Sequence, residues 1–137
     1  MPATIQTAHQ ATPATLCVIE TNPQLSDILT STFGQDSHSV YHANTAKIGF
    51  TAAKHASLVC VDLMLEDVDG SSLIEDIRMT DANKPLLAFS DNADRENMEM
   101  DSVAVRKLSE ACGANALVVT PAHLGELLQT IQRLLPE

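Results

Sequence analysis

Basic residues are scarce in this chain of 137 residues, which carries 8 Lys and Arg against 18 Asp and Glu, a formal net charge of −10. A protein that binds nucleic acid or an anionic membrane broadly needs a basic face, so the composition argues against both partners. The sequence also lacks an apolar run long enough to cross a bilayer. Three cysteines without metal-site spacing, and an N-terminus without the pattern of a secretory signal, favour reduced thiols in the cytoplasm.

Charge is absent from the first part of the chain. Residues 1–14 contain no Asp, Glu, Lys or Arg and are rich in Ala, Thr, Gln and Pro. Such a segment can bury little apolar surface, so it is predicted to be a flexible N-terminal tail. The remaining residues, 15–137, are enough for one domain with an ordinary hydrophobic core.

From residue 15 onward, short apolar runs alternate with helical patterns five times. This alternation predicts an α/β domain in which a parallel sheet is covered by helices on both faces. Two helix starts have further signals: Asn22 before Pro23 predicts an N-cap and first helical residue, and Ser72 with Glu75 predicts a capping box. The strands are expected at 16–19, 39–42, 58–63, 85–89 and 116–119, and the helices at 23–33, 44–55, 72–79, 94–111 and through Leu124 to Leu135.

Polar residues follow the ends of the buried strands. The central run, 58–63, includes Asp62, and the first strand ends on Glu20. Ligands of open α/β sheets bind outside the carboxyl ends of the strands, so these acids, with Ser90 and Thr120, are candidate site residues. Two carboxylates at one edge repel each other unless a cation intervenes, which favours a divalent ion with oxygen ligands. The alternative is that Glu20 points into solvent or caps the N-terminus of the helix that follows it.

The stretch from Val61 to Gly70, Val-Asp-Leu-Met-Leu-Glu-Asp-Val-Asp-Gly, resembles the phosphoacceptor strand and loop of response-regulator receiver domains. Gly113-Ala114-Asn115 is similar to the Gly-Ala-Asp that precedes the last strand of that family. The resemblance covers residues 15–135 and implies a flavodoxin-like, doubly wound, five-stranded sheet with strand order 2-1-3-4-5. It further implies Asp62 as the phosphoacceptor position, and Glu20, Asp62 and the Met64 carbonyl as ligands of Mg²⁺.

Several positions depart from the family pattern. Receivers usually place two adjacent acids after the first strand, whereas this chain has Glu20 and Thr21, so the implied binding of Mg²⁺ is weak. At the switch positions implied by the resemblance, Ser90 keeps the usual hydroxyl, Leu117 replaces an aromatic residue, and Thr120 replaces a lysine that pairs with the phosphoryl group.

No other base is well placed to replace the missing lysine. The sequence has no Lys or Arg between Lys107 and Arg133, and Lys84 precedes the fourth strand and is therefore expected at the opposite edge of the sheet. The only nearby candidate, His123, is more simply interpreted as an exposed residue at the start of the last helix.

Three functions remain open at this stage. The leading hypothesis is an atypical receiver without enzymatic activity, which acts through contacts with signalling proteins such as a histidine kinase or an output protein, with homodimerisation as a further option. The second hypothesis is a functional phosphoacceptor that is phosphorylated on Asp62 with weak support from Mg²⁺. The third, a phosphatase with an aspartate nucleophile, is disfavoured because Met64 stands where that class has a second acid. The acidic segment 91–101 makes the interval from Ser90 to Gly113 longer than is usual in receivers, and it is interpreted as a remodelled partner surface or a solvated helix.

Overall fold

The computed structural model describes residues 13–34, 38–65, 70–91, 113–120 and 124–135. Within these residues the chain alternates between strands and helices, as the sequence predicts. The elements are β1 (Thr15–Ile19), α2 (Gln24–Phe33), β2 (Ser39–Ala43), α3 (Ala46–Ala53), β3 (Leu58–Asp62), α4 (Gly70–Thr80), β4 (Leu86–Asp91), β5 (Ala116–Thr120) and α6 (Leu124–Leu134).

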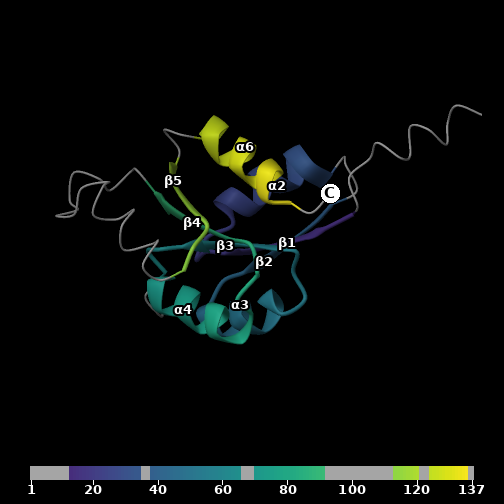
Figure 1. The fold of residues 1–137 in the computed structure, drawn as a ribbon. Helices are drawn as coiled ribbons and strands as arrows, with labels where there is room; N and C mark the ends of the chain where they lie inside the picture. Colours follow the sequence, from purple (N-terminus) through teal and green to yellow (C-terminus); the bar gives the residue numbers. More distant parts are fainter. Residues whose placement is uncertain (1–12, 35–37, 66–69, 92–112, 121–123, 136–137) are drawn as a thin grey trace, which may run out of the picture.

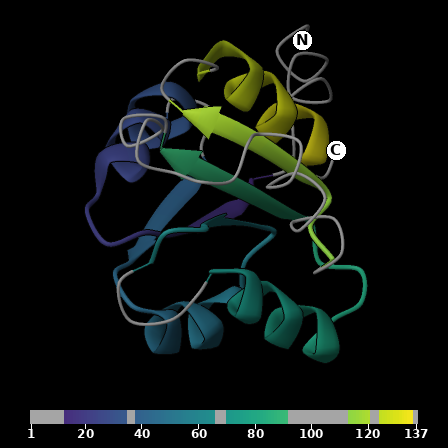
Figure 2. The same ribbon diagram turned by 90° about the vertical axis from the view of Figure 1, so that its left-hand side faces the viewer.

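The five strands form one parallel sheet in the order β2-β1-β3-β4-β5. Helices α2 and α6 lie on one face of the sheet, and α3 and α4 lie on the other (Figures 1 and 2). The predicted doubly wound architecture and its strand order are therefore confirmed. None of the helices in the described ranges is long and apolar enough to cross a membrane.

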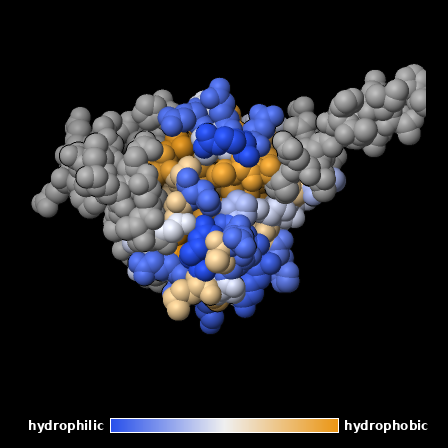
Figure 3. All heavy atoms as spheres, in the orientation of Figure 1, coloured by the Kyte–Doolittle hydropathy of each residue, from blue (hydrophilic) through white to orange (hydrophobic). Residues whose placement is uncertain are grey.

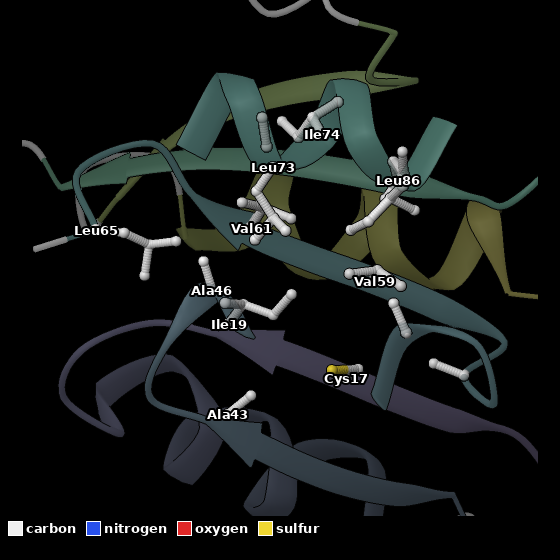
Figure 4. Close-up of a cluster of buried hydrophobic side chains, with 14 of the residues drawn as sticks. Cys17, Ile19, Ala43, Ala46, Val59, Val61, Leu65, Leu73, Ile74 and Leu86 are labelled. Carbon is white, nitrogen blue, oxygen red and sulfur yellow. The ribbon is translucent and has the colours of Figure 1, made fainter. Parts of the chain in front are cut away.

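Successive strand residues point to opposite faces, and this alternation gives the domain two apolar cores. On β1, Cys17 and Ile19 pack in the core beneath α3 and α4, which Figure 4 shows in close-up, whereas Leu16 and Val18 pack in the core beneath α2 and α6. Figure 3 shows hydrophobic side chains in the seam between α6 and the sheet, while the surface over α3 and α4 is mostly hydrophilic in that view. Burial of the strands on both faces explains why they are continuous apolar runs in the sequence.

Two predicted helix caps are wrong. The residue at the N-cap of α2 is Pro23, not Asn22, and its side chain makes no capping hydrogen bond. Helix α4 begins at Gly70, so Ser72 lies inside the helix. The reason for the early start is steric: a Cβ on residue 70 would lie 2.7 Å from the Cα of Leu63, so only glycine allows the helix to begin against the end of β3.

The predicted N-terminal tail lies outside the described residues up to position 12, as does the helix expected over 94–111. Ala14, which the sequence assigns to the tail, is buried, and its N–H donates to Nδ1 of His38 at 3.0 Å. Its carbonyl accepts from the N–H of Ser39, the first residue of β2. Ala14 is therefore part of the packed domain and not of the tail.

Arg78, a residue that the sequence analysis did not single out, forms hydrogen bonds between several segments at the amino edge of the sheet. Its guanidinium donates to the carbonyl of Gly113 at 2.7 and 3.1 Å and to the side-chain oxygen of Asn115 at 3.2 Å. It also donates to three carbonyls in the turn after α4, those of residues 81, 82 and 84. Arg78 thus connects the end of α4 to the segment that leads into β5.

Candidate functional site

The residues predicted to form a site lie at the carboxyl edge of the sheet. Ile19 is paired with Val61, so Glu20 and Asp62, one residue further along, lie level with each other on the neighbouring strands β1 and β3. Asp62 is paired with Phe89 on β4, which places Ser90 one residue beyond it. Because adjacent strands are about 4.8 Å apart, the backbone brings the two acids close together.

Asp62 is the last residue of β3 and is partly exposed. Its Oδ1 accepts a hydrogen bond from the N–H of Met64 at 2.8 Å, which fixes a tight turn directly after the strand. The N–H of Leu63 donates to the carbonyl of Phe89 at 2.9 Å and continues the pairing with β4 beyond Asp62. Gly70 packs against the same backbone, so the aspartate is held between a turn and the start of α4.

Glu20 is buried, with an exposed fraction of 4%. Its Oε1 accepts from the N–H of Leu25 at 3.0 Å, and its Oε2 accepts from the N–H of Ser26 at 2.8 Å and from the Ser26 hydroxyl at 2.7 Å. These donors belong to the first turn of α2, where free N–H groups and the helix dipole favour a negative charge. The alternative that Glu20 caps the following helix is therefore confirmed.

The negative charge of Glu20 also affects its surroundings. Burial raises the pKa of the Cys60 thiol, and it is raised further by repulsion from a Cys17 thiolate, where one forms, and from the Glu20 carboxylate. Burial likewise raises the pKa of Cys17 to about 12. Both thiols are therefore protonated near neutral pH and behave as small core residues.

The register places the three predicted switch positions on β4 and β5, the strands that lie beyond β3 on the side away from β1. Ser90 is buried and belongs to the row of β4 residues that faces α3 and α4, whereas Asp62 continues the row of Cys60, which faces α2 and α6. Leu117 is paired with Ala88 and is buried in the core beneath α3 and α4. Thr120, the last residue of β5, is paired with Asp91 of β4, so its backbone is two strands away from Asp62.

The carboxylate of Glu20 is poorly suited to bind Mg²⁺. A carboxylate offers about four lone-pair positions, and those of Glu20 already accept three hydrogen bonds from α2. One oxygen of Asp62 accepts from Met64, and Thr21 supplies no charge. No cluster of three or more Asp, Glu, His or Cys side chains suited to a metal occurs among the described residues. Mg²⁺ requires near-octahedral oxygen ligands and releases water reluctantly, so Glu20, whose oxygens already accept these three hydrogen bonds, is a poor ligand for it.

The sequence analysis did not single out Ser26, although this serine completes the cap on Glu20. Its position in the first turn of α2, six residues after Glu20, is the signal that could have identified it. Lys84 lies where the sequence predicts, away from the site, with its ammonium donating to the carbonyl of Ala56. The other alternative base, His123, lies outside the described residues, as does the acidic segment 92–101.

Comparison with known proteins identifies solved structures that share this fold. Neither the known family models nor the curated protein sequences include a match to this chain. Among solved structures, the chain is similar to chemotaxis protein CheY4 of Vibrio cholerae, with a TM-score of 0.73 and 19% identity over 90% of this chain and all of the other. It is also similar to a CheY-like response regulator receiver domain protein from Methanospirillum hungatei, with a TM-score of 0.72 and 18% identity over 89% of this chain and 93% of the other.

A third similar structure is a putative response regulator from Chloroflexus aurantiacus, with a TM-score of 0.74 and 16% identity over 90% of this chain and 98% of the other. The fold of this chain is that of response-regulator receiver domains. The resemblance inferred from the stretch around Asp62 is thus confirmed at the level of the fold, across nearly the whole length of these domains.

Proposed function

We propose that this chain is an atypical receiver module of two-component-type signalling, which acts through protein–protein contacts and in which the standard phosphorylation switch is impaired. Its partners are signalling proteins of the cytoplasm, and the module has no enzymatic activity of its own. The observation that carries this proposal is the binding of the Glu20 carboxylate to three donors of α2.

One acid, Glu20, directly follows β1, and another, Asp62, ends β3. With Thr21 as its neighbour, Glu20 is the only acid directly after β1, and its charge already stabilises a helix terminus. Of these two acids, Asp62 is left for a cation or a phosphoryl group, and Asp91 ends β4 at the same edge. A phosphoryl group carries between one and two negative charges near neutral pH and needs cations or donors around it. Thr120 carries no charge, and of the basic side chains in the described residues, Lys84 and Arg78 bind backbone carbonyls at the other edge.

A second function has its own support. Asp62 is partly exposed at the end of the central strand, and it lies where a receiver with an active phosphoacceptor would place this residue. Phosphorylation of Asp62 with weak help from Mg²⁺ therefore remains the competing proposal. The two differ in whether an adduct forms on Asp62 and whether it changes the distant surface.

The test is incubation of the ¹⁵N-labelled protein with Mg²⁺ and beryllofluoride, which mimics an aspartyl phosphate, and separately with acetyl phosphate. We expect no phosphoryl adduct by mass, and no amide shifts that extend from Asp62 into residues 113–120. The matched variant carries Thr21→Asp and Thr120→Lys, which together add an acid and a base to the edge. This variant should respond to both reagents.

The outcomes separate the proposals. A response of the variant alone supports the atypical receiver, because it shows that the missing charges are what disable the site. Amide shifts across residues 113–120 in the unmodified protein would establish the phosphoacceptor instead. If neither protein responds, the family pattern does not govern this edge, and the proposal of an impaired switch fails.

A further inference from the structure

The longest stretch of the chain without acidic residues begins after α2 and ends within β3. No Asp or Glu occurs between Asp36 and Asp62, although the protein has 18 acids and a net charge of −10. The stretch contains Lys47, Lys54 and three of the five histidines, and it includes the whole of β2 and α3. This part of the surface therefore differs in charge from the rest of the molecule.

A groove lies between α3 and the β2 edge of the sheet, and it has a volume of about 710 Å³. Cys17, Tyr41, Ile48 and Ala52 give it apolar walls, and Lys47 and His55 lie toward the two ends of the helix that borders it. We refer to it as the α3 groove. Two large apolar side chains that line it are well exposed, Tyr41 at 47% and Ile48 at 44%. Its size falls in the range of pockets that hold ligands or anchoring side chains.

The neighbouring strand β2 is an edge strand, because among the strands that the structure describes it is paired with β1 alone. The N–H of Ser39 donates to Ala14, and the carbonyl of Ala43 accepts from Glu20, so both residues direct their backbone groups toward β1. By alternation, Val40 and His42 direct theirs away from the sheet. Proteins usually protect such an edge with Lys, Pro or an inward charge, and β2 has none of these within Ser39–Ala43.

We propose that the β2 edge and the α3 groove form a docking surface for an extended acidic segment of a partner protein. The segment adds a strand beside β2, through the backbone groups of Val40 and His42. Every second side chain of the segment then faces α3, where the apolar ones enter the α3 groove over Tyr41 and Ile48 and a carboxylate at the end of the same row lies beside Lys47. Addition of a strand to an exposed sheet edge is an established way to bind extended peptides.

Charge complementarity determines which kind of peptide segment binds to this surface. A basic peptide would be attracted more strongly to the acidic remainder of the chain, whereas the stretch that contains Lys47 and Lys54 attracts an acidic peptide. Two lysines are too few to hold the domain on an anionic membrane, where each base near the surface contributes only about 1 kcal/mol. The surface does not involve Asp62, so this inference stands whether or not Asp62 is phosphorylated.

The test uses a blocked heptapeptide, Glu-Ser-Val-Ser-Val-Ser-Glu, titrated into the ¹⁵N-labelled full chain. In an extended strand its Glu and Val side chains alternate with Ser and share one face. We expect saturable amide shifts that are concentrated in residues 39–43 and 47–55. One control peptide has Lys in place of Glu. The other has the same composition as the probe but the order Val-Val-Ser-Ser-Ser-Glu-Glu, which destroys the alternation that an added strand needs. Neither control should produce these shifts at the same concentration.

Three variants locate the contacts. Lys47→Glu should weaken binding about fivefold, the upper end for an exposed charge pair, whereas Arg133→Glu on α6 makes the same change of charge elsewhere and should leave binding unchanged. Val40→Pro removes an N–H that points away from the sheet, so the fold should persist while binding is lost. Tyr41→Ala provides an independent check of the groove if the proline variant does not fold.

Several results would overturn the proposal. One is equal binding of the lysine peptide or of the blocked-order peptide. Another is a loss on Arg133→Glu as large as that on Lys47→Glu. Shifts located outside residues 39–55, or no shifts at all with the alternating peptide, count equally against it. Binding to phosphatidylglycerol vesicles that Lys47→Glu abolishes, without peptide binding, would assign the surface to a membrane.

Discussion

Replacement of Glu20 by alanine should destabilise the domain by about 2–3 kcal/mol. The substitution leaves the N–H groups of Leu25 and Ser26 and the Ser26 hydroxyl without their buried acceptor. Loss of a capping side chain alone costs about 0.5–2 kcal/mol, and hydrogen bonds to a charged acceptor are worth about 1.5–3 kcal/mol each. Part of this loss is offset, because a buried carboxylate no longer has to be removed from water. Glu20→Gln keeps one acceptor oxygen and should cost about half as much.

Urea denaturation followed by circular dichroism measures the effect. For a domain of this size the m-value is about 2 kcal/mol/M, so the midpoint of Glu20→Ala should fall by about 1–1.5 M. The control is Thr21→Ala, a change at the next residue that makes no contact with α2 in the described hydrogen bonds and should stay within about 0.5 kcal/mol of the unmodified protein. The experiment is run with EDTA and again with Mg²⁺.

Two results would refute the reasoning about Glu20. If Glu20→Ala is no more destabilising than Thr21→Ala in EDTA, the cap contributes nothing measurable. If the destabilisation appears only when Mg²⁺ is present, the carboxylate is primarily a metal ligand. Asp62→Asn separates the two acids further, because removal of one of two neighbouring like charges should be neutral or mildly stabilising.

Three further expectations concern other parts of the fold. Gly70→Ala should destabilise by about 2 kcal/mol or more in a urea melt, because the new Cβ meets the backbone of β3, whereas Gly125→Ala, with open space around it, should be neutral or stabilising. Because the pKa of Cys17 is raised from its ordinary value near 9 to about 12, the folded state retains a proton that the unfolded state releases, so unfolding free energy should fall from pH 9 toward 12 and fall less steeply in Cys17→Ala. Arg78→Lys should cost about 2 kcal/mol and speed amide exchange in β5, since an ammonium cannot replace the planar fork that holds the carbonyl of Gly113.

The sheet could be predicted from sequence because its strands are buried on both faces. A strand such as Leu58–Asp62 must be apolar at nearly every position, and an acid at its end then marks the carboxyl edge. Strand order followed from the resemblance around Asp62 rather than from the strands themselves. The helix between residues 94 and 111 was predicted from composition and remains a prediction, since the described residues do not include it.

Helix starts were harder to predict, because the groups that satisfy them are not local in sequence. Asn22 is a good N-cap residue by type, but the N–H groups of α2 are satisfied by Glu20, which reaches them from the end of β1. The start of α4 depends on how closely Gly70 approaches the backbone of β3. Local propensity favoured Ser72, whereas tertiary packing determined the observed start. Such contacts between elements leave no short-range pattern.

On the proposed function, the cap on Glu20 and the altered switch positions act in the same direction. An adduct on Asp62 can shift the domain between two states only by as much as its contacts differ in free energy between them. In a receiver with a lysine after its last strand, the charge-assisted contact to the phosphoryl group supplies about 1.5–3 kcal/mol of that difference. Loss of such a contact, as implied by Thr120, forfeits up to about a hundredfold in the ratio of the two states. Leu117, the second altered switch position, is already packed beneath α3 and α4 and has no hydroxyl that could exchange partners. A partner of this domain would then bind a surface whose structure does not depend on Asp62. Its binding should therefore survive Asp62→Ala.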